Sequence, residues 1–501
     1  MAVTAFTSAA ARFAGVVATT VLAMPCAFAA SDFRELVVRL DHSVEEAPVA
    51  IDLDGATGLV AVGRIAEQWR FSVIAMPDGN VVATGAIPAS VFFYDTGDLL
   101  GRGYDALYFL DPRGVAEPDV ARGALLHVAE LPSLYHGETA QGPAFADFVR
   151  DVDGDDRDDI LLPQFDGWLL ARQSRSGFKR FLLEVPARVK IYDDLVSYQP
   201  RLPHSGDIDG DGRDDLVFLL DTEFLSFVQS PDASFSGSGR RDAVGAPLAS
   251  EKQRAQWERD DGQVDQSDLE IEEVELVRDF NADQIPDLLT EKSISKGVFD
   301  RRSEYHLYLG QRSGAALIYP GTADGSIASG GIQFDPLVVD VDGDGLMDVA
   351  TPSTRLGLAR IVSALFSGRI SVDLDVYRMR PGGRYPEESD YRTRFKVEFD
   401  LETGLMRYPA VIIADVDGDG PTELLVQEDA DELSVYPGVG GRELFGEREK
   451  VLSLPLPRNG QMVEARDVDQ DGRMDLLVRY GPADGAERVG ELRILFSRAV
   501  P

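Results

Sequence analysis

A nine-residue acidic pattern is repeated six times in this chain, and it constrains the fold more than any other feature. Each copy carries carboxylate or amide side chains at positions 1, 3, 5 and 9, counted from its first aspartate. The copies begin at Asp151, Asp207, Asp279, Asp340, Asp415 and Asp467. Their starts lie 52 to 75 residues apart. Repeats on that scale indicate a solenoid, a propeller or another array rather than unrelated domains.

Short apolar runs flank the acidic copies on both sides. The copy at Asp415 follows "AVIIA" (410–414) and precedes "LLV" (424–426), and the other copies have similar neighbours. No long stretch of the chain has an apolar period of 3.6 residues, so the sequence predicts strands rather than helices. The repeated unit is therefore expected to be a strand, an acidic loop and a second strand.

The spacing of the acids indicates a cation site in each loop. Oxygen atoms at positions 1, 3 and 5 of a tight loop converge on one point, and a backbone carbonyl at position 7 and a carboxylate at position 9 add to them. Calcium accepts roughly six to eight oxygen ligands in tolerant geometry, whereas magnesium demands a stricter octahedron. Glycine at position 6 permits the turn in four copies, whereas Gln284 is less suited to it.

The sequence therefore predicts five to six Ca2+ sites. The predicted ligands, with position 7 acting through its carbonyl, are Asp151, Asp153, Asp155, Arg157 and Asp159; Asp207, Asp209, Asp211, Arg213 and Asp215; Asp279, Asn281, Asp283, Ile285 and Asp287; Asp340, Asp342, Asp344, Leu346 and Asp348; Asp415, Asp417, Asp419, Pro421 and Glu423; and Asp467, Asp469, Asp471, Arg473 and Asp475. These loops are not EF-hands, because position 12, where an EF-hand needs glutamate, holds no carboxylate in any copy.

Composition narrows the compartment and the class of partner. The formal net charge is −37, which argues against nucleic acid as a partner because its phosphates would be repelled. Arg12 and the apolar run after it, ending in small residues at Ala27 and Ala29, predict a signal peptide over residues 1–29. Cys26 is the only cysteine. The mature chain is therefore expected to lack disulfides and any membrane-spanning segment, and to be secreted, periplasmic or attached to the cell surface.

Two stretches carry a resemblance to a known family. "PAFADFVRDVDGDDRDDILL" (143–162) and "AVIIADVDGDGPTELLV" (410–426) resemble the FG-GAP/VCBS repeats of integrin α-subunit propellers and of many secreted bacterial proteins. The resemblance covers at least residue 143 to the C-terminus. It implies an all-β propeller with calcium in its loops, all on one face. In the integrin propellers, that face is distinct from the ligand face.

The number of blades follows from the loops and from the residues before them. Six loops give six blades, and "SVFFYDTGDLLGRGYDALYFLD" (90–111) predicts a seventh whose loop keeps only Asp98 and Asp105. Residues 49–64 suggest the trace of an eighth, so we expect seven blades, with eight as the alternative. The expected division is residues 30–89 as N-terminal strands, for closure or a degenerate blade, and 90–501 as the propeller. Only two strands follow Asp475, so residues 34–40 are expected to complete the last blade.

No catalytic motif accompanies the repeats. The five histidines lie in different repeats, and no nucleophile elbow, phosphate loop or dinucleotide fingerprint occurs. The sequence predicts a non-enzymatic binding, adhesion or scaffold module for a protein or glycan; the alternative is a polysaccharide-active lyase or hydrolase on the same scaffold. The segment 378–394 is basic and aromatic in an acidic chain. We expect it to contact a partner through Arg380, Arg384 and Tyr385.

Overall fold

The computed structural model describes most of the chain after the predicted signal peptide. The described residues are 33–132, 142–175, 177–192, 195–250, 253, 269–295, 301–314, 316–328, 332–333, 335–354, 368–399, 406–441 and 443–498. The signal peptide predicted at residues 1–29 lies outside them. Within these ranges, no helix has the length and apolar character needed to cross a membrane.

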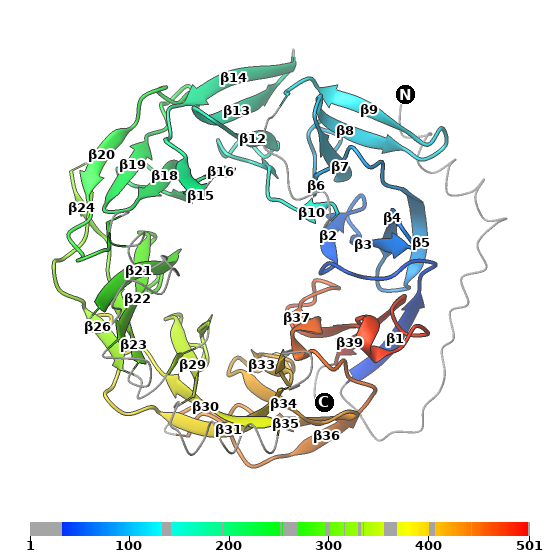
Figure 1. The fold of residues 1–501 in the computed structure, drawn as a ribbon, viewed down its shortest axis with the longest axis vertical. Helices are drawn as coiled ribbons and strands as arrows, with labels where there is room; N and C mark the ends of the chain where they lie inside the picture. The colour runs from blue at the N-terminus through cyan, green and yellow to red at the C-terminus, as the bar shows by residue number, and fades with distance from the viewer. Residues whose placement is uncertain are drawn as a thin grey trace.

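The described strands form eight blades arranged in a ring, and the chain runs once around it (Figure 1). Blades 1 to 4 contain β2 (Val49–Asp52), β3 (Thr57–Ile65), β4 (Gln68–Ala75) and β5 (Asn80–Ala86); β6 (Phe93–Gly97), β7 (Ala106–Asp111), β8 (Gly114–Asp119), β9 (Ala124–Ala129) and the parallel β10 (Ala144–Phe145); β11 (Val149–Arg150), β12 (Asp159–Gln164), β13 (Gly167–Ser174) and β14 (Gly177–Leu183); and β17 (Pro203–Gly206), β18 (Asp215–Leu220), β19 (Glu223–Phe227) and β20 (Arg240–Ala243).

The second half of the ring is built in the same way. Blades 5 to 8 contain β21 (Leu269–Arg278), β22 (Asp287–Ser295), β23 (Arg301–Tyr308) and β26 (Gly325–Ala328); β27 (Ile332–Gln333), β28 (Leu337–Val339), β29 (Asp348–Thr354), β30 (Arg369–Tyr377), β31 (Tyr391–Phe399) and β32 (Met406–Arg407); β33 (Val411–Ala414), β34 (Glu423–Asp429), β35 (Glu432–Tyr436) and β36 (Lys450–Ser453); and β37 (Val463–Arg466), β38 (Asp475–Arg479), β39 (Glu491–Ser497) and β1 (Phe33–Arg39). Two hairpins lie outside the blades: β15 (Arg188–Tyr192) with β16 (Leu195–Gln199), and β24 (Gln311–Ser313) with β25 (Ala316–Ile318).

The apolar runs after the acidic loops become the second strands of the blades. Successive side chains of a strand point to opposite faces of its sheet, and each blade is covered by a neighbour on both faces. Ile160 and Leu162 of β12 therefore pack into the cluster between blades 2 and 3, whereas Leu161 packs into the cluster between blades 3 and 4. Among the described residues there are eight such clusters, one for each pair of neighbouring blades.

An N-terminal strand closes the ring, as predicted because only two strands follow Asp475 and the last blade lacks one. β1 pairs antiparallel with β39, from Phe33 opposite Ser497 to Arg39 opposite Glu491. In Figure 1 the dark blue β1 lies beside the red β39. Leu36 and Val38 of β1 pack in one cluster with residues of blade 1. Closure leaves blade 8 with its full set of strands, which removes the open edge that would otherwise invite aggregation.

The ring has the larger of the two blade numbers that the sequence allowed. Seven blades would require residues 49–86 to fall short of a blade, but they form four paired strands. Their innermost turn is only four residues long, because Asp52 pairs directly with Thr57. Blade 1 therefore has no acidic loop, and the count of loop motifs could not reveal it.

Candidate metal centres

Each acidic loop joins the innermost strand of a blade to the second strand, and its first aspartate shapes the loop. In blade 6, Asp340 Oδ1 accepts hydrogen bonds from the backbone N–H of Gly343 at 2.8 Å and of Asp344 at 3.1 Å. Its Oδ2 accepts one from Gly345 N–H at 2.8 Å. In all six loops, position 1 accepts a hydrogen bond from the amide of position 6. This carboxylate acts as the template around which the chain turns.

Two residues of each loop, rather than one, have positive φ. In the Asp340 loop they are Gly343 at 75° and Gly345 at 86°. The sequence pointed to position 6, but position 4 has the same requirement. In the Asp279 loop both positions lack glycine: Ala282 has φ of 60° and Gln284 has φ of 65°. Such residues carry a local conformational cost, so the Asp279 loop is the most strained of the six.

The carboxylate at position 9 ties the loop to the third strand. Asp348 is 1% exposed, and it accepts hydrogen bonds from Val341 N–H at 2.9 Å and from Met379 N–H at 2.8 Å. Met379 follows β30, so one side chain fixes both the loop and the strand beyond it. The equivalent residues make the same pair of bonds; they are Asp159, Asp215, Asp287, Glu423 and Asp475.

Burial and neighbouring charges disfavour ionisation at position 9 in the absence of a cation. Burial raises the pKa of Asp348 to about 7, and the carboxylates of Asp342 and Asp340 add to the shift, although the two backbone N–H groups oppose it. The pKa of Asp159, Asp287 and Glu423 is likewise raised to about 7, first by burial. A cation at this place would remove the repulsion among the acids.

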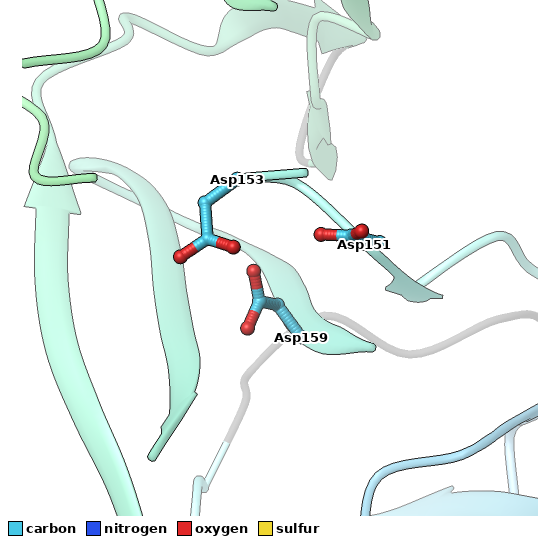
Figure 2. A group of neighbouring side chains, drawn as sticks. All are labelled: Asp151, Asp153 and Asp159. Atoms are coloured by element: carbon cyan, nitrogen blue, oxygen red, sulfur yellow. The ribbon is translucent and has the colours of Figure 1, made fainter. Parts of the chain in front are cut away.

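The structure brings the acids of five loops into compact groups. In each group of three, carboxylate oxygens lie within 4.8 Å of one another. Among the described residues the groups are Asp151, Asp153 and Asp159; Asp207, Asp209 and Asp215; Asp340, Asp342 and Asp344; Asp415, Asp417 and Glu423; and Asp467, Asp469 and Asp475. Figure 2 shows Asp153 and Asp159 pointing toward one another beside Asp151. These five groups could hold a metal ion.

The sixth loop has the same backbone with one acid fewer. Asp279 accepts from Asp283 and Gln284 N–H, and Asp287 is buried like its counterparts. Asn281 replaces the acid at position 3, and its amide donates to Asp283 Oδ2 at 3.0 Å. The Asp279 loop therefore has the shape of a cation site but less negative charge.

Buried oxygen atoms at position 3 have no partner in three of the loops. Oδ1 of Asp153, Asp342 and Asp469 is buried and accepts no hydrogen bond from any described residue. A buried carboxylate oxygen left without a partner is costly. A cation inside the loop would supply that partner, so the donor set of these loops fits a bound metal ion.

In three loops an arginine at position 7 pairs with the acid at position 5. Arg157, Arg213 and Arg473 stand at position 7, and each pairs with the position 5 aspartate of its own loop. In the Asp340 loop position 7 is Leu346, which has no charge. There the position 5 acid, Asp344, joins the group with Asp340 and Asp342.

Backbone contacts link neighbouring loops around the ring. The amide of position 8 donates to the preceding loop in three cases: Met347 to Phe280 O at 2.9 Å, Thr422 to Val341 O at 3.0 Å and Met474 to Asp415 O at 2.9 Å. The loops therefore lie side by side on one face of the propeller, as the resemblance implied.

Two glutamines that the sequence analysis overlooked brace adjacent blades. Gln173 Nε2 donates to Asp98 O at 3.0 Å, and Gln229 Nε2 donates to Asp153 O at 2.9 Å. Each glutamine lies 14 residues after the position 9 acid of its own blade, to which its backbone N–H donates. This repeated spacing was the signal that could have revealed them.

The basic and aromatic segment packs beside the Asp340 loop. Tyr385 is 9% exposed, lies in the cluster between blades 5 and 6, and donates from its hydroxyl to Met347 O at 2.9 Å. Arg380 pairs with Asp390 at 2.5 Å, whereas Arg384 is exposed. The predicted partner contact stays a prediction, but the Tyr385 ring is part of the core and supports the Asp340 loop.

Aspartates neutralise most of the arginines in and beside that segment. Arg378 donates to Asp342 Oδ2 at 3.1 Å and also pairs with Asp390 at 3.3 Å. The pairs Arg392 with Asp375 and Arg394 with Asp373 lie on β31 and β30. The positive charge that stands out in the sequence is therefore largely paired within blade 6.

Comparison with known proteins agrees with this architecture. A model of the FG-GAP-like repeat matches residues 415–478, which include the Asp415 and Asp467 loops. No curated protein matches the chain. Among solved structures, the V. cholerae biofilm matrix protein Bap1 is similar with 12% identity over 93% of this chain and 87% of that one, at a TM-score of 0.37. An Agrocybe aegerita lectin that recognises non-reducing terminal N-acetylglucosamine is similar with 14% identity over 66% of this chain and 84% of that one, at a TM-score of 0.26.

The repeat match and the ring of blades point to the same family. The matched residues run from the Asp415 loop to β38, and the same arrangement of strand, acidic loop and strand occurs in blades 3 to 8. The chain is a β-propeller with an FG-GAP-like repeat at residues 415–478.

Proposed function

We propose that the chain is an exported, calcium-binding propeller that works as a binding, adhesion or scaffold module for a protein or glycan, without catalysis of its own. The observation that carries the proposal is the set of buried, unpartnered Oδ1 atoms of Asp153, Asp342 and Asp469 inside loops already folded around position 1. They provide oxygen ligands in a shape that the protein sets in advance.

Calcium is the cation that suits these loops best. The carboxylates of positions 1, 3 and 9, the carbonyl of position 7 and, where no arginine competes, the carboxylate of position 5 offer only oxygen ligands. Calcium takes many oxygen ligands in flexible geometry, and magnesium keeps its waters. When bound, calcium supplies the positive charge that holds the acids together. Each loop lies between two strands, and backbone hydrogen bonds link the last four loops in sequence, so the expected role of the cation is to stiffen the ring.

In this proposal, the rigid ring serves to bind a ligand and not to catalyse a reaction. Loops on a rigid scaffold commonly carry binding residues, and the net charge of −37 disfavours nucleic acid as the ligand. The expected location is the periplasm, the cell surface or the medium, because residues 1–29 have the pattern of a signal peptide.

The test combines metal stoichiometry with ligand capture. The exported chain is stripped with chelator, titrated with calcium by calorimetry, and then applied to a glycan array and a pull-down in both forms. We expect five to six calcium ions per chain and ligand capture that is stronger in the calcium form. A chain that takes up no calcium, or calcium-loaded protein that retains neither glycan nor protein, would contradict the proposal.

A further inference from the structure

A cavity lies among the innermost strands of blades 3, 4 and 5. Its volume is about 550 Å³, within the range of small-molecule sites. β17 forms its centre, and the ends of β11 and β21 and the Asp207 and Asp279 loops form its walls. Three successive blades thus contribute to one cavity beside two candidate cation loops.

Two arginines give the cavity donors for an anion. Arg278, at the end of β21, is exposed and has no ion-pair partner among the described residues. Arg150, at the end of β11, pairs with Asp147 only at 3.5 Å, and its Nε is buried without an acceptor among those residues. Arginine presents a planar set of donors that matches a carboxylate in a bidentate manner. Both guanidinium groups therefore have capacity for an incoming carboxylate.

The remaining polar lining residues suit hydroxyl groups. Ser205, Gln284 and Asp214 also line the cavity and can accept hydrogen bonds. His204 lies near Arg150, and burial, together with the Arg150 charge, lowers the pKa of His204, which keeps its ring neutral. A neutral imidazole both donates and accepts. The cavity thus combines cationic donors for one carboxylate with acceptors for several hydroxyls.

We propose that this cavity binds an acidic saccharide, with the carboxylate of a uronic acid residue at Arg278 and Arg150 and the sugar hydroxyls at Ser205, Asp214 and Gln284. The inference rests on the proposed function, which it narrows to one ligand class and one site. An acidic peptide fits less well, because it lacks the hydroxyl groups that could donate hydrogen bonds to Asp214. Calcium in the loops of Asp207 and Asp279 would reduce the negative charge at the cavity wall.

The experiment measures oligosaccharide binding by calorimetry with the whole exported chain in calcium. The probes are trigalacturonate, its carboxyl-reduced counterpart trigalactose, and hexaglutamate. The variants are Arg278→Ala, Arg278→Lys and Arg113→Ala. Arg113 is a matched control because its side chain is 67% exposed and lies in blade 2. The melting temperature of each variant is recorded, and Arg278→Ala should fold normally because Arg278 is exposed.

We expect trigalacturonate to bind and trigalactose to bind at least tenfold more weakly. Arg278→Ala should weaken trigalacturonate binding about 10- to 100-fold, as expected for one charge-assisted contact. The affinity of Arg278→Lys for trigalacturonate should lie between those of the wild type and Arg278→Ala. The affinity of Arg113→Ala should match that of the wild type. Failure of trigalacturonate to bind, equal binding by Arg278→Ala, or binding of hexaglutamate instead would overturn the inference. The proposed function would survive that result if the array or pull-down still captured another ligand.

Discussion

The loop that joins the innermost strand to the next strand differs between blades 1 and 2 and blades 3 to 8. Blade 2 keeps the template at position 1, because Asp98 accepts from Arg102 N–H at 2.8 Å and from Gly103 N–H at 2.6 Å. The register then places Ala106 at position 9, since Gly97 pairs with Ala106 as Arg150 pairs with Asp159. The loop of blade 2 therefore has the shape of a cation loop without its ligands.

The lost ligands of blade 2 are replaced by contacts between blades. Asp105 stands at position 8, one residue before the ligand position, and its Oδ2 accepts from Asp52 N–H of blade 1 at 2.8 Å. Asp95 is 3% exposed and accepts from Phe148 and Val149 N–H, each at 2.7 Å, where blade 3 begins. Blades 1 and 2 therefore resemble blades 3 to 8 in that carboxylates anchor backbone amides. A cation bound in the loops of blades 3 to 8 would add to that anchoring.

Removal of calcium should have the largest effect, and it should affect blades 3 to 8 but not blades 1 and 2. A ligand at 10 to 100 times its dissociation constant adds about 1.4–2.7 kcal/mol per site, so loss of several sites should lower the melting temperature clearly. Hydrogen exchange should rise in the loops of blades 3 to 8 and stay unchanged at 52–57 and 98–106. The measurement is mass-spectrometric exchange in excess chelator and in millimolar calcium. Equal changes in hydrogen exchange in blades 1 and 2 and in blades 3 to 8 would show that the comparison is wrong.

Loss of a position 9 carboxylate should have the next largest effect. Asp348→Ala leaves the buried amides of Val341 and Met379 without an acceptor, at about 1–3 kcal/mol for each. We expect a total loss of about 2–6 kcal/mol, even in chelator, because both hydrogen bonds form without a metal ion. Asp98→Ala in blade 2 is the matched control, since its bonds are exposed, and should cost less than about 1 kcal/mol. Chemical denaturation in chelator measures both, and similar losses would contradict the assignment.

The six loops should differ in calcium affinity. Asp342→Ala removes a buried ligand from the Asp340 loop, which has two glycines at its positive φ positions, and should lower the stoichiometry by about one. Asp283→Ala should remove a weaker site, because its loop has Asn281 at position 3 and the strained Ala282 and Gln284. Titration calorimetry of the two variants orders the sites. A finding that Asp283→Ala removes the tightest site would reverse this ranking.

The repeated loop was enough to predict the fold, because each copy implies the two strands beside it. Closure was also predictable, since only two strands follow Asp475 and blade 8 therefore lacks one of its four strands. Blade 1 was hard to count because a four-residue turn, 53–56, carries no ligand pattern. The degenerate loop of blade 2 was recognised, but the role of Asp105 depends on contact with Asp52, which lies 53 residues away in sequence.

The candidate ligands followed from spacing within nine residues, whereas their surroundings did not. Tyr385 looked like a surface residue because it lies among charged residues. Its ring is buried because Phe280 and Leu289 of the preceding blade reach it in space. The arginines of its segment looked unpaired because their partners, such as Asp342 and Asp375, come from a loop and a neighbouring strand. Local pattern predicts the ligand set, and contacts distant in sequence decide which charges stay free.

The smallest predicted effect concerns acid and the seam that closes the ring. His42 lies between β1 and β2, is 3% exposed, and contacts Ser43 O through Nδ1 at 2.6 Å and Ser72 Oγ through Nε2 at 2.8 Å. Nδ1 then donates to the carbonyl, and Nε2 accepts from the hydroxyl.

Burial lowers the pKa of His42 below its usual 6.5, so the folded state keeps the ring neutral while the unfolded chain takes up a proton. The contribution of His42 to stability should therefore be complete above pH 6.5 and be lost as the pH drops below it. His42→Gln, which cannot be protonated, should lose this slope but keep hydrogen-bonding groups. Melting temperatures between about pH 5 and 7.5 are compared between wild type and variant, because the loop carboxylates with a pKa of about 7 titrate over the same range in both proteins and only the difference reports His42. An identical slope in the variant would place the acid sensitivity elsewhere.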